Sequence, residues 1–180
     1  MSDLDQDLDP LEGFPEPAKG TCRALVLSPI DAPAALKAGL QLVGSPVPVI
    51  KTNKGSAAFI EVEQDQPSEE EELVALLGED RPIPEEVASL ASLISKMAAG
   101  GAVALTSWTS AGAEGVSGTI TARRFVNGAP EQKLSSGLVL AKVGTVAEDL
   151  LLGAITPQAA ESLTSGKKWT GFLRGPGFRN

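Results

Sequence analysis

Apolar residues are spaced along this chain in two ways, in short continuous runs and at intervals of three and four. The short runs are typical of strands, whereas the wider spacing is typical of amphipathic helices. In chain order the pattern predicts a strand at 22–28, a helix at 31–43, strands at 47–51 and 57–62, a helix at 84–99 and a strand at 102–108. This is the β-α-β-β-α-β order of ferredoxin-like folds, so we predict an α+β domain with that order over about residues 22–109. A short helix at 69–77 is also predicted, as an insertion in this order.

The helix at 84–99 has the clearest periodicity. Its apolar side chains recur at helical spacing, at Val87, Leu90, Ala91, Ile94, Met97 and Ala98. The polar side chains on the opposite side, which we expect to face solvent, are Ser89, Ser92, Ser95 and Lys96. Such a division predicts a helix that packs one face on the core of the domain.

The C-terminal third of the chain predicts a β-hairpin followed by a helical extension. A strand at 116–127 ends in Asn127-Gly128, a typical hairpin turn, and the apolar run at 138–143 predicts a further strand. Helices at 145–152 and 156–165 are then predicted by two start signals, Thr145 with Glu148 and Thr156 with Pro157. Because residues 145–165 contain no lysine or arginine, we interpret these helices as a packed helical hairpin and not as a DNA-binding unit.

Charged residues are distributed unequally along the chain. The net charge is −8, but residues 1–86 hold 18 acidic and 6 basic side chains, whereas residues 87–180 hold 5 acidic and 9 basic ones. With the apolar pattern, this predicts a disordered acidic tail at 1–20, a single α+β domain at 21–166 and a basic aromatic segment at 167–180. An acidic chain is poorly suited to neutralise phosphates, so we expect no nucleic-acid partner.

The chain contains no histidine, no tyrosine and a single cysteine, Cys22. This composition excludes histidine-dependent triads and the Cys/His ligand sets of zinc sites, and we expect no cofactor and no metal. Tuned carboxylates and Ser–Lys pairs remain as catalytic groups, and Ser92 and Lys96 lie one helical turn apart. Such spacing is common on solvated helix faces. Whether the protein is an enzyme stays open, and a His-free hydrolase is the least favoured of three hypotheses.

A glycine-rich stretch at 110–118 carries the second hypothesis. Gly112, Gly115 and Gly118 are spaced by three and follow a predicted strand, as phosphate-binding loops do. The stretch fits neither nucleotide-binding fingerprint, and a strand is predicted after it instead of a helix. We therefore expect a hairpin loop, with a small-ligand-binding regulatory module as the alternative.

The C-terminal segment carries the first hypothesis. It concentrates cations and aromatic rings that the rest of the chain largely lacks, at Lys167, Lys168, Trp169, Phe172, Arg174 and Phe178. Aromatic residues and arginine are favoured anchors of protein interfaces. The sequence therefore favours a non-enzymatic interaction or assembly component that binds a protein partner or a second copy of itself. Packing of this segment on its own domain stays open.

The expected cellular location rests on the membrane, signal and disulfide features of the sequence. No window approaches the roughly 18 apolar residues of a membrane span, and the acidic first residues do not have the pattern of a signal peptide. A lone cysteine forms no intrachain disulfide. We expect a cytoplasmic protein with no membrane partner.

Overall fold

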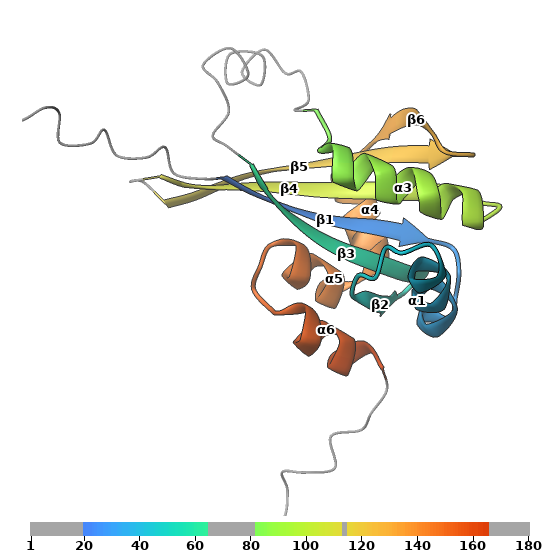
Figure 1. The fold of residues 1–180 in the computed structure, drawn as a ribbon. Helices are drawn as coiled ribbons and strands as arrows, with labels where there is room; N and C mark the ends of the chain where they lie inside the picture. Colours follow the sequence, from blue (N-terminus) through green and yellow to red (C-terminus); the bar gives the residue numbers. More distant parts are fainter. Residues whose placement is uncertain (1–19, 65–81, 113–114, 166–180) are drawn as a thin grey trace, which may run out of the picture.

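The computed structural model describes residues 20–64, 82–112 and 115–165, in which six strands form one antiparallel sheet (Figure 1). The strands are β1 (Gly20–Ser28), β2 (Val49–Thr52), β3 (Gly55–Gln64), β4 (Ala102–Gly112), β5 (Gly115–Val126) and β6 (Ala129–Leu134). Their order across the sheet is β2-β3-β1-β4-β5-β6, and every neighbouring pair runs antiparallel. This mixture of helices with an antiparallel sheet confirms the predicted α+β class.

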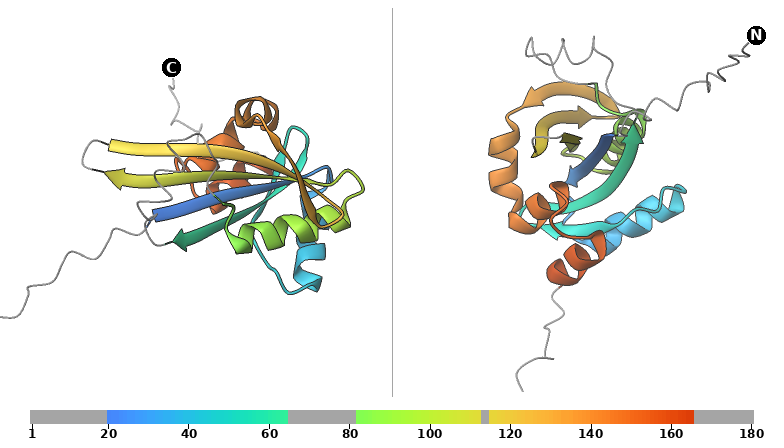
Figure 2. Two further views of the ribbon diagram at one scale, coloured as in Figure 1. Left: turned by 90° about the horizontal axis from the view of Figure 1, so that it is seen from above. Right: turned by 90° about the vertical axis from the view of Figure 1, so that its left-hand side faces the viewer.

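Helices lie on both sides of the sheet (Figures 1 and 2). The described helices are α1 (Pro33–Leu42), α3 (Glu85–Met97), α4 (Ser136–Val143), α5 (Thr145–Leu151) and α6 (Pro157–Thr164). Helices α1 and α3 contribute to the core on one face, which we call the first face. Helices α4, α5 and α6 contribute to a separate core on the other, the second face. None of these described helices combines the length and the apolar run needed to cross a membrane.

The central strand β1 supplies both cores because its side chains alternate between the two faces. Ala24 and Val26 belong to the first core and Leu25 to the second, and all three are 0% exposed. Val26 lies between Ala58 of β3 and Ala104 of β4 in the strand register. Alanine at both flanking positions leaves room for α1 and α3 to pack closely on the sheet.

The structure corrects the prediction of a strand at 138–143. These residues lie in the helix α4, and the strand that pairs with β5 is β6. A short apolar run does not distinguish a buried strand from a helix, because its period is not visible. Asn127 and Gly128, with φ of 49° and 88°, form a two-residue turn, so pairing with β5 resumes at once at Ala129.

The predicted helix starts have mixed outcomes. Thr156 is confirmed as the residue that caps α6, since its hydroxyl accepts a hydrogen bond of 3.3 Å from the Ala159 N–H, and Pro157 follows in the first turn. Helix α5 begins at Thr145 as predicted, but the predicted capping of its start by Thr145 with Glu148 is wrong. Gly144 occupies the cap position of α5, with φ of 98° and no side chain to accept a bond. The predicted helix start at residue 31 is also displaced, since Ala32 precedes α1. The predicted helix at 69–77 lies outside the described residues.

The predicted loop at 110–118 is largely strand. β4 and β5 stay paired to their ends, where Gly112 lies opposite Gly115 and Gly118 lies opposite Thr109. Only residues 113–114, which are outside the described ranges, stand between the two strands. The glycine spacing therefore belongs to a long hairpin, and its role in ligand binding stays a prediction.

Candidate functional site

The predicted binding residues of the C-terminal segment lie outside the described residues. These are Lys167, Lys168, Trp169, Phe172, Arg174 and Phe178. The structure does describe the point from which this segment continues, since α6 ends at Thr164 and is followed by Ser165. The position of α6 therefore decides where the segment begins.

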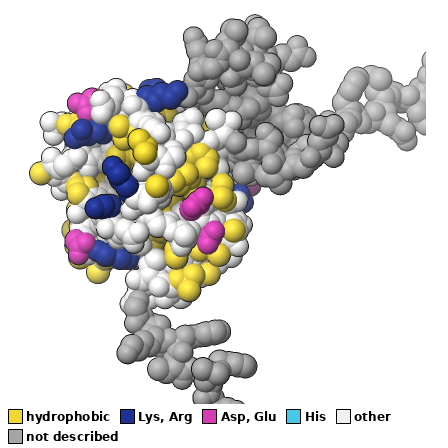
Figure 3. Space-filling model, turned by 180° about the vertical axis from the view of Figure 1, so that it is seen from behind, with side chains coloured by type: hydrophobic (Ala, Val, Ile, Leu, Met, Phe, Trp, Pro, Cys, Tyr) yellow, Lys and Arg dark blue, Asp and Glu magenta, His cyan; other side chains and the backbone are white. Residues whose placement is uncertain are grey.

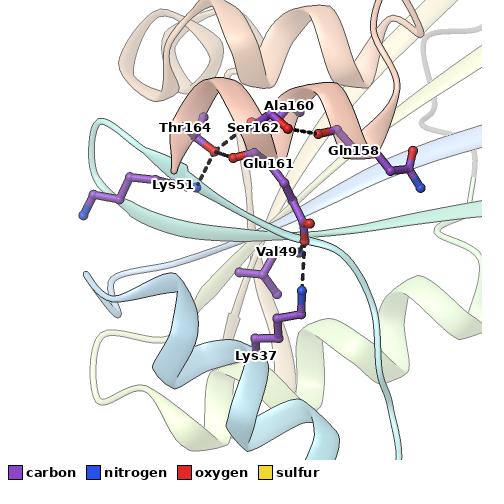
Figure 4. Close-up of polar contacts among 8 residues, drawn as sticks. All are labelled: Lys37, Val49, Lys51, Gln158, Ala160, Glu161, Ser162 and Thr164. Carbon is purple, nitrogen blue, oxygen red and sulfur yellow. Dashed lines mark hydrogen bonds and ion pairs between the residues drawn. The ribbon is translucent and has the colours of Figure 1, made fainter. Parts of the chain in front are cut away.

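Helix α6 covers the outer edge of the sheet at β2 (Figure 4). The carboxylate oxygen Oε1 of Glu161 accepts hydrogen bonds from the Val49 N–H at 3.3 Å and from the Lys37 ammonium at 3.2 Å. The hydroxyl of Thr164 accepts one from the Lys51 N–H at 3.4 Å and donates to the Ala160 carbonyl at 2.8 Å. Two N–H groups that an edge strand usually leaves open are thus satisfied by side chains of one helix.

The C-terminal end of α4 completes the cover of this edge. The Asn53 N–H donates to the carbonyl of Val143 at 3.3 Å, one residue beyond the end of β2. The opposite edge of the sheet is β6, an exposed strand with Pro130, Glu131 and Lys133. Proline and charged side chains discourage another strand from pairing there. Both edges of the described sheet are therefore protected, by different means.

A shallow depression of about 690 Å³ lies between α1, β2 and α6. Its charged groups neutralise one another, since Lys37 pairs with Glu161 and the Lys51 ammonium pairs with the Asp31 carboxylate. Ser165 lines the depression, so the C-terminal segment continues from its rim. This arrangement holds the end of the domain in place and leaves no unpaired charge in the depression for a ligand.

Glu161 is expected to hold α6 on the sheet mainly through the Val49 N–H. Glu161→Ala is expected to cost about 1–3 kcal/mol of unfolding free energy, because a part-buried N–H loses its acceptor. Glu161→Gln keeps an amide oxygen and removes only the charge of a partly exposed ion pair, so we expect a loss below about 1 kcal/mol. Urea unfolding followed by circular dichroism measures both variants. Equal losses would contradict this account, because they would assign the effect to the ion pair with Lys37.

Glu161 and Thr164 were not predicted as functional residues from the sequence. Their spacing of three places both side chains on one face of α6, which is the only local signal. Nothing in the sequence indicates that this face meets β2, which lies 112 residues earlier in the chain.

Ser89 and Lys96 of α3 are exposed as predicted, but Ser92 is only partly exposed and Ser95 is buried, so the prediction that these two serines face solvent is wrong. The Ser92 hydroxyl donates to the Gly128 carbonyl and the Gly128 N–H donates to the Ser95 hydroxyl, both at 2.8 Å, and Ser95 is 1% exposed. These two bonds join α3 to the turn between β5 and β6. The Ser92 hydroxyl is therefore occupied by a backbone carbonyl and is not paired with Lys96 as a nucleophile.

Charge in the described part of the chain is balanced. It holds nine acidic and nine basic side chains, and none of these is buried. Residues 1–19 hold six acidic and one basic side chain, residues 65–81 hold seven and one, and residues 166–180 hold four basic and no acidic ones. Apart from Glu114, the charge excess of the protein lies in these three segments.

Apolar surface on the described domain is dispersed. The exposed large apolar side chains are Leu42, Val43, Met97, Leu138, Leu152 and Leu163. On the side of the molecule in Figure 3, hydrophobic side chains form separate patches with lysine and arginine side chains between them. That side therefore has no single large apolar interface of the kind that obligate dimers bury.

Comparison with protein-family models, with curated proteins and with solved structures finds no match to this chain.

Proposed function

We propose that the protein is a non-enzymatic interaction or assembly component that binds an acidic protein surface through residues 167–180. In the first instance this surface belongs to a second copy of the chain. One observation carries the proposal: the described domain holds equal numbers of acidic and basic side chains, whereas the residues that follow α6 hold four basic and no acidic ones. The contacts of Glu161 and Thr164 with β2 give this segment a fixed starting point.

The residue types of the segment support a protein partner. Trp169 and Arg174 belong to the types most often found as interface anchors, and Lys167 and Lys168 supply long-range attraction to acidic surfaces. Residues 1–19 and 65–81 supply thirteen acidic side chains on every copy of the chain. In a head-to-tail contact, the basic segment of one copy pairs with acidic side chains of the next copy.

We also propose that β1, α1, β2, β3, α3 and β4 form a ferredoxin-like unit over about residues 22–109. The order β2-β3-β1-β4 and the helices after β1 and β3 support this assignment. In α+β folds the helices often lie on one side of the sheet. In this protein α4 and α5 also occupy the second face, so we place the binding surface outside the sheet. Cys22 is the one cysteine of the sequence and is buried, which suits a cytoplasmic location as part of the same proposal.

Removing two cations from the segment tests the proposal. Lys167→Gln with Lys168→Gln is expected to weaken self-association in sedimentation velocity at low salt, because it removes half of the positive charge of 166–180. Lys96→Gln with Arg123→Gln is the control. It makes the same change in net charge at two described cations for which the structure shows no ion pair, and we expect association close to that of the unaltered chain. Equal weakening by both pairs would attribute the effect to net charge alone and contradict the proposal.

A further inference from the structure

The second face of the sheet has a gap that α4 does not cover. On this face Leu25 lies opposite Leu105, and both are 0% exposed. One step further along the same strands, Leu27 lies opposite Val103, and these two are only partly buried. They help to line a pocket of about 270 Å³ at the end of the sheet. The pocket is thus formed where the second helical layer ends.

The walls of this pocket are mostly apolar. Besides Leu27 and Val103, the apolar residues that line it are Pro29, after β1, Ala102 of β4, and Val139 and Val143 of α4. A volume of this size holds about nine water molecules, or a ligand with about as many non-hydrogen atoms. It lies slightly below the usual range of small-molecule sites.

Two lysines line the same pocket from different elements. Lys54 belongs to the turn between β2 and β3, and Lys142 belongs to the last turn of α4. Among the residues that the structure describes, no acidic side chain lines the pocket and neither lysine forms an ion pair. By contrast, Arg23, Lys37 and Lys51 each pair with a carboxylate.

A backbone hydrogen bond holds the two lysine-bearing elements together. The Asn53 N–H donates to the Val143 carbonyl at 3.3 Å, and these residues are the immediate neighbours of Lys54 and Lys142. The Thr52 hydroxyl accepts a further bond of 3.3 Å from the Lys54 N–H and orders the turn. The backbones of two lysines are therefore anchored beside one apolar pocket, and a bound anion would reduce the repulsion between their two positive charges.

We propose that this pocket binds a small carboxylate with an apolar body of about six carbon atoms. The apolar body occupies the gap over Leu27 and Val103, and the carboxylate accepts hydrogen bonds from the ammonium groups of Lys54 and Lys142. Neither a purely apolar ligand nor an anion without an apolar body uses both halves of the site. The proposal does not depend on the C-terminal segment.

Titration of the isotope-labelled full chain with hexanoate, followed by amide NMR shifts, tests this site. We expect saturable shifts at Thr52, Lys54, Gly101 and Val139, and binding about fivefold weaker in Lys54→Gln and in Lys142→Gln, as for the loss of one charged partner. Lys96→Gln, which changes a cation outside this pocket, is expected to bind hexanoate as the unaltered chain does. All three lysines are exposed, so the variants are expected to fold.

Two reference probes separate the halves of the site. Hexan-1-ol has the apolar body without the charge, and acetate has the charge without the apolar body, so both are expected to bind more weakly than hexanoate. Three results overturn the proposal: no shift at tens of millimolar hexanoate, equal binding of either reference probe, or unchanged affinity in both pocket variants.

Discussion

Leu151→Ala is expected to lower the free energy of unfolding by about 2–5 kcal/mol, the range for a buried leucine that leaves a cavity. Leu151 is 0% exposed and belongs to the core of the second face, together with Leu25 and Leu105 of the sheet. Because α5 packs on the sheet through this core, loss of the Leu151 side chain is expected to destabilise the whole domain. Urea unfolding followed by circular dichroism measures the loss.

The next residue in the chain provides a matched control. Leu152 is 46% exposed, so Leu152→Ala removes the same atoms from a position that is half in water. We expect a loss below about 1 kcal/mol for this variant. Similar losses at Leu151 and Leu152 would mean that α5 does not pack on the second face.

Gly101→Ala is expected to cost about 4 kcal/mol or more, a size that indicates a specific steric defect. Gly101 precedes β4 with φ of 78°, and a Cβ atom there would lie 2.4 Å from the carbonyl oxygen of Phe125. That oxygen belongs to the neighbouring strand β5, so neither group moves without disturbing the sheet. The same unfolding experiment measures the effect.

Gly44→Ala is a control that measures the backbone strain without the steric clash expected at Gly101. The φ of 76° at Gly44 nearly equals that of Gly101, but apart from its chain neighbours no heavy atom lies within 4 Å of the Cβ position. Gly44→Ala therefore pays only the left-handed backbone strain, about 1–2 kcal/mol. Losses of equal size in the two variants would contradict the close approach of β5 to Gly101.

The sequence predicted those elements whose pattern is long or whose turn chemistry is distinctive. The helix α3 was predicted because Val87, Leu90 and Ile94 repeat over three turns. The start of α6 was predicted from Thr156 and Pro157. The strand β6 was missed because it is polar and exposed, with Pro130 near its start, and shows no apolar alternation.

The candidate sites depend on contacts between distant segments, which a single sequence does not contain. Glu161 meets Val49 only because α6 returns to the edge of the sheet. Lys54 and Lys142 line one pocket only because the turn after β2 hydrogen-bonds to the end of α4. The uneven distribution of charge, in contrast, is read directly from the sequence by counting residues.

The mass of the protein in solution tests the central claim most directly. Light scattering at low salt is to be compared for the full chain and for a chain that ends at Ser165, the last residue described after α6. We predict a concentration-dependent mass above that of the monomer for the full chain and a monomeric mass for the shortened one, with unchanged unfolding free energy. A monomeric full chain whose stability falls when residues 166–180 are removed would contradict the claim, because the segment would then pack on its own domain.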